Sequence, residues 1–279
     1  MTKQRTLKKS VSVLGKGLHS GVEVQLKLNP AGIDSGIIFV RTDLSDAPKI
    51  HATAANVTST VRATTLEENG VKVFTVEHLM SAFNACGVDN CLVEMDSEEP
   101  PVLDGNSIGF CDMIKSAGTI EQDAERREIR IEKIYRADSD DGKKFILALP
   151  YDGFRVSFTS INPHPLIGVQ FEDFEITEEI YRAEIAPART IAYEKEVDAL
   201  RAMGLGRGGN LQNVIVYNDS GWLNELRYAD ELVRHKILDV IGDMRLAGFL
   251  KCHIIAVASG HALNTALAKK IFADFLIEP

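Results

Sequence analysis

The order of secondary-structure signals repeats once along the 279 residues, and this repeat constrains the fold more than any other feature of the sequence. Each half begins with alternating or apolar segments typical of strands, at 22–28 and 36–41 and again at 129–135, 145–149 and 154–158. Each half closes with helix, strand and helix, at 76–86, 90–96 and 107–117 and again at 231–247, 252–259 and 262–275. We therefore expect an α+β fold of two similarly folded two-layer domains, each a mixed or antiparallel sheet packed on helices.

The polar stretch 121–128 separates the two repeats, and its charge density is typical of an exposed connection. It predicts a first domain at 1–124 and a second at 125–279. Between the strands and the closing elements of the second half, the sequence predicts a helix at 194–203, a glycine-rich turn and a strand at 214–217. Gly204, Gly206 and Gly209 match a dinucleotide fingerprint in spacing, but that motif requires a preceding strand and a following helix, and the order here is reversed.

Composition excludes several classes of function. Apolar residues make up 45% of the chain and charged residues 25%, as in soluble globular proteins, and the net charge of -9 argues against nucleic acid or an anionic membrane as the main partner. The longest apolar stretch, 254–258, is too short to cross a bilayer, and no secretory signal or paired cysteine motif is present. We expect a cytoplasmic protein with no nucleic-acid ligand, no integral membrane segment and no obligate protein partner.

A candidate metal site combines residues from both halves. His235 and Asp239 are four apart on the expected helix 231–247, so both side chains leave the same face, although a solvated surface pair has the same spacing. His78 lies near the start of the equivalent helix in the first half. Two imidazoles and one carboxylate form a usual catalytic zinc set with an open position for water, whose pKa zinc lowers to about 7; Fe²⁺ accepts the same set. The site would then lie at the domain interface.

Three further residues are candidates for proton transfer or support. Glu77 is adjacent to His78, and neighbouring helical side chains point about 100° apart, so Glu77 is placed to reach a water held by the ion, as a general base does. The alternative is a first-turn carboxylate favoured by the helix dipole, with Thr75 as the N-cap. His261 follows an apolar strand, in a position that is either functional or an ordinary polar loop. Asp243 lies one turn beyond Asp239 and could hold an imidazolium, or it could be an exposed helix residue.

Long motifs in a fixed order connect these residues to a known family. The motifs are Arg5-Thr-Leu-Lys-Lys-Ser10, Gly17-Leu-His-Ser-Gly21, Thr75-Val-Glu-His-Leu-Met-Ser-Ala82, Leu103-Asp-Gly105, Ala188-Arg-Thr190, Arg234-His-Lys-Ile-Leu-Asp239 and Ser259-Gly-His-Ala-Leu-Asn264. With them the sequence resembles, nearly end to end, the UDP-3-O-acyl-N-acetylglucosamine deacetylases, zinc enzymes of lipid A synthesis in Gram-negative bacteria.

The resemblance implies a substrate, a reaction and a role for each site residue. The substrate would be UDP-3-O-acyl-N-acetylglucosamine, whose N-acetyl group is hydrolysed in the committed step of lipid A biosynthesis. The resemblance assigns zinc to His78, His235 and Asp239, the base to Glu77, the acid to His261, oxyanion stabilisation to Thr190, the substrate side of the site to Lys236, and a contact with His261 to Asp243.

The resemblance also implies that an insertion at about 191–218 forms an apolar passage for the acyl chain. Ile191 departs from the aromatic residue usual in the family, and we expect Tyr193 to take that role. Among the remaining histidines, His51, His164 and His253 are expected to be structural, as is His19, for which a direct substrate contact is the alternative.

Two other function classes stay open. One is a zinc amidase that acts on another acylated amine or amino sugar. The other is a catalytically silent protein that binds a nucleotide sugar or a lipid. The presence of both Glu77 and His261 counts against the silent protein, because binding alone requires neither residue.

Overall fold

Alternation of buried and exposed side chains builds the first main sheet. In β3 (Glu23–Pro30), Val24, Leu26 and Leu28 are fully buried, whereas the residues between them face solvent. The computed structural model, which describes residues 2–275, places β3 between β2 (Val11–Lys16) and β9 (Cys91–Met95), with β4 (Ile37–Arg41) and β5 (Lys49–His51) beyond β9. β9 and β4 run parallel, and the other neighbours run antiparallel.

The second main sheet has the same strand order and the same directions. Its order is β12 (Tyr135–Asp138), β13 (Phe145–Leu149), β19 (Phe249–Val257), β14 (Phe154–Ile161) and β15 (Val169–Glu175). β19 and β14 are the parallel pair here, as β9 and β4 are in the first sheet, and β11 (Glu128–Arg130) adds a parallel partner at one end of β19. The repeat expected from the sequence therefore extends to sheet topology, while the domain limits 1–124 and 125–279 stay a prediction.

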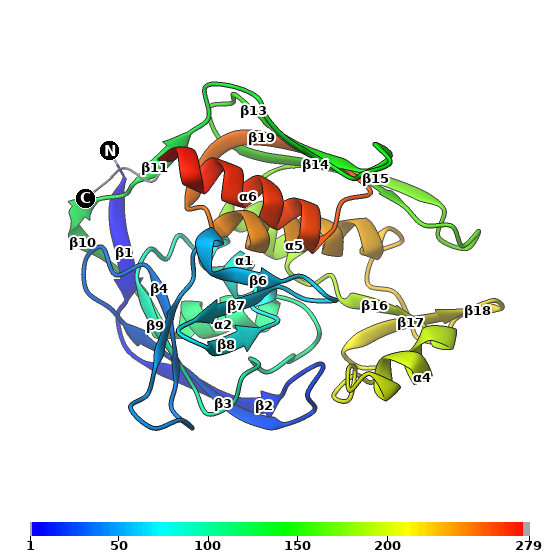
Figure 1. The fold of residues 1–279 in the computed structure, drawn as a ribbon, viewed down its shortest axis with the longest axis horizontal. Helices are drawn as coiled ribbons and strands as arrows, with labels where there is room; N and C mark the ends of the chain where they lie inside the picture. Colours follow the sequence, from blue (N-terminus) through cyan, green and yellow to red (C-terminus); the bar gives the residue numbers. More distant parts are fainter. Residues whose placement is uncertain (1, 276–279) are drawn as a thin grey trace.

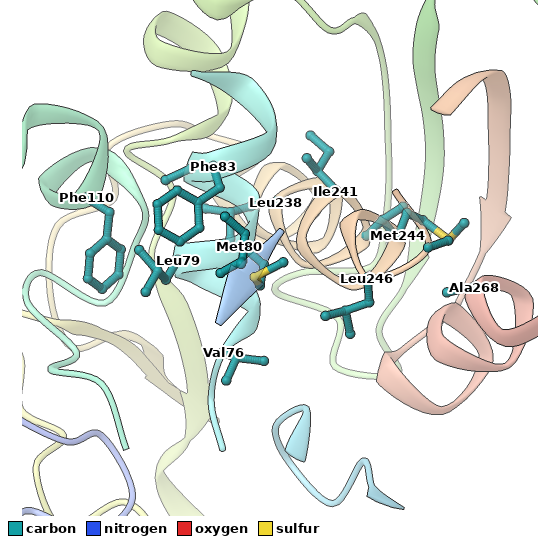
Figure 2. Packing of buried hydrophobic residues seen from close by; sticks show 14 of the residues in the cluster. Val76, Leu79, Met80, Phe83, Phe110, Leu238, Ile241, Met244, Leu246 and Ala268 are labelled. Atoms are coloured by element: carbon teal, nitrogen blue, oxygen red, sulfur yellow. The ribbon is translucent and has the colours of Figure 1, made fainter. Parts of the chain in front are cut away.

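Helices of both halves lie between the two main sheets (Figure 1), and their buried residues form one common core with those of the sheets. These are α1 (Glu77–Ala85) and α2 (Ile108–Ala117) from the first half and α5 (Glu231–Arg245) and α6 (His261–Phe275) from the second. Figure 2 shows Leu79, Met80 and Phe83 of α1 beside Leu238 and Ile241 of α5. The α+β fold expected from the sequence is confirmed, with mixed sheets packed against helices.

A glycine allows α1 and α5 to approach closely. Gly242 lies in α5 opposite the backbone of Glu77, and a Cβ atom added at Gly242 would lie 2.0 Å from the Glu77 carbonyl oxygen. A real Cβ atom cannot lie so close to an oxygen, so the two helix backbones can approach this closely only with glycine at position 242. The crossing fixes the first turn of α1, which carries Glu77 and His78, against the C-terminal part of α5.

Smaller elements surround this four-layer arrangement. A small sheet of β6 (Val57–Ser59), β7 (Thr65–Glu68) and β8 (Val71–Phe74) lies near α1. The 191–218 segment contributes β16 (Thr190–Tyr193), α4 (Glu194–Ala202) and β17 (Val214–Asn218), with β18 (Gly221–Trp222) as a third strand. A 3-10 turn at Ala54–Asn56, α3 (Glu178–Ile180) and a π-helical turn at Tyr181–Ile185 connect other elements.

Two local expectations differ from the structure. The stretch 121–128 is exposed as expected, but it falls largely in β10 (Thr119–Glu125), which pairs antiparallel with β1 (Lys3–Leu7), instead of forming an unpaired connection. The single strand expected at 129–135 is divided between β11 and β12, which join different neighbours. In the described range 2–275, no helix is long and apolar enough to cross a bilayer. The cysteines Cys86, Cys91, Cys111 and Cys252 are buried and free.

Candidate active site

The crossing of α1 and α5 brings His78, His235 and Asp239 together. One ligand atom from each lies within 4.8 Å of the others, and their exposed fractions are 5%, 3% and 2%. Asp239 Oδ1 lies 3.4 Å from His235 Nε2 and 3.8 Å from His78 Nε2. This buried oxygen has no hydrogen-bond partner among the described residues. An unpaired buried carboxylate oxygen beside two imidazole nitrogens is costly by itself and fits a divalent metal ion.

The protonation states of these three groups suit metal binding. Burial, followed by the nearby His235, lowers the pKa of His78 to about 3, so His78 is neutral at neutral pH. Burial also lowers the pKa of His235. Burial opposes the charge on Asp239, but Lys236, whose Nζ lies 2.7 Å from Asp239 Oδ2, and the nearby histidines hold the pKa of this carboxyl below its usual range. Neutral imidazoles and an ionised carboxylate are the forms that bind metals.

A backbone carbonyl sets the tautomer of His235. Nδ1 of His235 lies 3.0 Å from the carbonyl oxygen of Ala188, and a carbonyl only accepts, so Nδ1 carries the proton. Nε2 is then left with its lone pair facing Asp239 and His78. Ala188 directly precedes Arg189, whose backbone N–H and guanidinium both donate to the fully buried carboxylate of Glu231 at the start of α5. This ion pair holds the Ala188 carbonyl in place.

Glu77 opens α1 and faces the same cavity as the three ligand candidates. Burial raises the pKa of its carboxyl to about 7. Its Oε1 lies 3.8 Å from His261 Nε2, and its Oε2 accepts a hydrogen bond from the backbone N–H of Thr64. The expectation that Thr75 caps this helix is wrong: the capping position is Val76, without a side-chain cap, and the Thr75 hydroxyl donates instead to Glu99.

His261 begins α6 and lies against Asp243 of α5. Nδ1 of His261 is 2.9 Å from Asp243 Oδ2, and Asp243 is fully buried. Burial opposes the charge on His261, but Asp243 and Glu77 outweigh burial and raise the pKa of the imidazole to about 10. His261 is therefore charged at neutral pH and can donate a proton from Nε2 toward the cavity.

These residues line one end of a cavity of about 690 Å³. Thr190 and Lys236 line the same space, while Asp243 lies behind His261 and outside the lining. The cavity is also lined by the apolar residues Leu18, Val197, Leu200, Val214 and Val216, which we call the apolar chamber, with Glu194, Asp198 and Arg201 of α4 beside them. One cavity thus joins the candidate reaction groups to the apolar chamber, most of which comes from the 191–218 segment.

The placement of Tyr193 and of His19 differs from what the sequence led us to expect. Ile191 lines the cavity, whereas Tyr193 stacks on Tyr217 at 4.9 Å and is not among the lining residues. His19, expected to be structural, lines the cavity, and its Nε2 is buried without a partner among the described residues. Its Nδ1 accepts the backbone N–H of Gly206 at 3.3 Å, so this imidazole joins the turn 17–21 to the glycine-rich loop 204–209.

Sequence reasoning missed several residues that support the site. Thr64 contacts both Glu77 and Asp243, and Asn264 donates to Asp243 at 2.9 Å. Asn264 could have been found, because it lies three residues after His261 on one helix face. Thr64 carries no such signal, because its role depends on a loop that packs against both α1 and α5, two helices that are far apart from each other in sequence.

An α+β protein with a buried His, His and Asp group beside a carboxylate and a charged imidazole has the arrangement of a metal-dependent hydrolase. The family model for UDP-3-O-acyl N-acetylglycosamine deacetylase matches residues 4–273, and the chain belongs to this family.

Three curated relatives carry the name UDP-3-O-acyl-N-acetylglucosamine deacetylase. The protein from Hahella chejuensis is 43% identical over 98% of this chain and 92% of the relative. The protein from Marinobacter nauticus is 43% identical, and the protein from Pseudomonas entomophila is 44% identical, each over 98% of this chain and 91% of the relative. The resemblance expected from the motifs is thus confirmed across nearly the whole chain.

Proposed function

We propose that this chain hydrolyses the N-acetyl group of UDP-3-O-acyl-N-acetylglucosamine, releasing acetate, as the committed step of lipid A biosynthesis in the cytoplasm. The proposal depends above all on one observation: the partnerless Asp239 oxygen faces two neutral imidazoles in a cavity that also contains Glu77 and His261. Membership of the deacetylase family supports the substrate.

His78, His235 and Asp239 would hold the metal, for which we propose zinc, with Fe²⁺ as the alternative. When bound, zinc supplies Lewis acidity, which polarises a carbonyl group and lowers the pKa of a water molecule. Glu77, with a pKa of about 7, is suited to accept a proton from water at neutral pH. Thr190 lines the same end of the cavity, and its hydroxyl is available to donate to the oxygen that gains negative charge.

Cleavage of the amide expels an amine, which is a poor leaving group unless it is protonated. His261 carries a proton at neutral pH, and Asp243 holds the opposite edge of its ring. We assign the donation of this proton to His261 Nε2. The separated pKa values of Glu77 and His261 suit a base and an acid acting in one reaction.

The apolar chamber is proposed to hold the 3-O-acyl chain. Burial of methylene groups against Val197, Leu200 and their neighbours stabilises the complex by about 0.8 kcal/mol per methylene before ordering costs. Lys236 lines the polar end, where its ammonium both supports Asp239 and faces the substrate side.

The test measures acetate release from UDP-3-O-acyl-N-acetylglucosamine by metal-free protein reconstituted with Zn²⁺ or Fe²⁺. We expect Glu77→Ala to lower turnover by orders of magnitude while one metal per chain is retained. The matched control Glu23→Ala, at an exposed position of β3, should leave turnover unchanged. Retained turnover in Glu77→Ala would overturn the assignment of the base. Equal turnover of UDP-N-acetylglucosamine, which lacks the acyl chain, would indicate a more general amidase.

A further inference from the structure

Thr64 makes hydrogen bonds to both sides of the proposed acid-base pair. It lies directly before β7, is fully buried, and lies two residues after Arg62, whose backbone has a left-handed φ of 64°. Its backbone N–H donates to Glu77 Oε2 at 3.1 Å, and its hydroxyl donates to Asp243 Oδ1 at 2.6 Å. One residue of the first half therefore contacts the carboxylate at the start of α1 and a carboxylate in the last turn of α5.

The Asp243 carboxylate depends on these contacts for its orientation. Oδ2 is shared by His261 Nδ1 and the Asn264 amide, each at 2.9 Å, while Oδ1 accepts from Thr64. Because Asp243 is fully buried, loss of the Thr64 hydroxyl leaves one oxygen of a buried charge without its donor. Only the contacts of Oδ2 with Asn264 and His261 then orient the carboxylate, so its rotation is less restricted, and so is the position of the His261 ring that it holds.

The direction of the hydroxyl bond is fixed by chemistry. An ionised carboxylate only accepts, so the Thr64 hydroxyl must donate its one hydrogen to Asp243. The backbone N–H can only donate, and it donates to Glu77. Thr64 thus donates one hydrogen bond to each of the two carboxylates and fixes where each of them lies relative to the other.

We propose that Thr64 is a positioning residue for catalysis, which sets the Glu77 carboxylate and, through Asp243, the His261 imidazole at the separation that proton transfer requires. This proposal rests on the proposed function, because it needs Glu77 and His261 to act as base and acid. It goes beyond that function in assigning the alignment of the two groups to one threonine in a loop. Thr64 itself does not line the cavity, so it acts through its neighbours.

The test compares Thr64→Val, Thr64→Ala and Thr64→Ser in the full metal-loaded chain, with acetate release as the assay. Valine keeps the branched shape and the backbone N–H and removes only the hydroxyl. We expect kcat to fall roughly tenfold to hundredfold, as the loss of a hydrogen bond to a charged group does, with KM and metal content unchanged. Serine should restore kcat to within a few fold of the original protein.

Thr6→Val is the matched control. Thr6 is also buried, and its hydroxyl donates to a backbone carbonyl at 2.8 Å, far from the cavity. This change should lower stability without lowering kcat, which separates a structural threonine from a positioning one. Equal kcat in Thr64→Ala and Thr64→Ser would overturn the proposal even if Thr64→Val does not fold, because alanine and serine differ only by the hydroxyl. Retained turnover in Glu77→Ala would instead refute the proposed function, whatever the Thr64 variants do.

Discussion

Gly242→Ala should separate the two helices that carry the metal-ligand candidates. The added Cβ would lie 2.0 Å from the Glu77 carbonyl oxygen and 2.8 Å from its carbonyl carbon. Ordinary contacts of this kind begin near 3.4 Å, so the methyl group and the carbonyl oxygen must move apart by about 1.4 Å. Both atoms belong to helix backbones, and neither can rotate away as a flexible side chain does.

The magnitude follows from two opposing effects. Alanine is favoured over glycine inside a helix by about 1 kcal/mol, which stabilises the variant. Overpacking of a filled core costs typically about 1 to 3 kcal/mol, and occasionally more, and here the clash is with backbone. We expect a net loss of about 1 to 2 kcal/mol in the free energy of unfolding. Displacement of reacting groups by about 1 Å can lower turnover about a hundredfold, so activity should suffer more than stability.

Urea unfolding, metal content and acetate release measure these effects on the same preparation. Gly32→Ala is the control, because Gly32 does not need a positive φ and the nearest contact of its added Cβ is the Ser35 hydroxyl at 3.5 Å. We expect Gly242→Ala to bind metal more weakly and to turn over slowly, and Gly32→Ala to match the original protein. Unchanged turnover and unchanged unfolding in Gly242→Ala would refute the reasoning that this crossing fixes the site.

Four further outcomes are expected. His78→Ala should lose bound metal and turnover together, as measured by elemental analysis, and full metal retention would exclude His78 as a ligand. The pKa of His261 is raised to about 10 in the folded protein. The charged imidazole therefore stabilises the fold fully below its ordinary pKa near 6.5, and this stabilisation is lost as pH rises through 10. In metal-free protein, the difference in unfolding free energy between the original chain and His261→Gln should narrow over that range. Glu231→Ala leaves the buried Arg189 without its partner and should cost about 3 to 5 kcal/mol in urea unfolding. Leu200→Glu should raise KM for long-chain substrates much more than for short-chain ones, because Leu200 lines the apolar chamber; an equal rise for both would argue against the chamber as the acyl site.

Periodicity predicted the elements of this fold wherever one element buries one face. The elements at 145–149 and 107–117 are examples, because their buried residues follow strand spacing and helix spacing, respectively. Prediction failed where charge density was taken as a sign of an exposed connection between the two halves. β10 is a strand with mostly exposed side chains, and its pairing with β1 comes from backbone hydrogen bonds that leave no hydrophobic pattern.

The candidate site was likewise predictable only in part. The sequence pairs His235 with Asp239 by their spacing on one helix, and it indicates Glu77 and His78 by their position in the equivalent helix of the first half. Their meeting at one point depends on the crossing at Gly242, which periodicity does not contain. The Thr75 cap was wrong because its hydroxyl has a stronger acceptor in the buried Glu99 carboxylate, 24 residues away in sequence. Contacts between residues so far apart in sequence arise from tertiary packing, and local sequence propensities do not predict them.

The division of the proposed ligand set between α1 and α5 would make ion occupancy and the docking of the two halves a single linked equilibrium. An ion that binds only the docked form stabilises it by RT ln(1 + [L]/Kd), about 2.7 kcal/mol at a free concentration one hundred times Kd. Removal of the ion by a chelator should then weaken the interface between the two halves as well as stop turnover. By the same linkage, any partner or substitution that separates the two halves should release the ion.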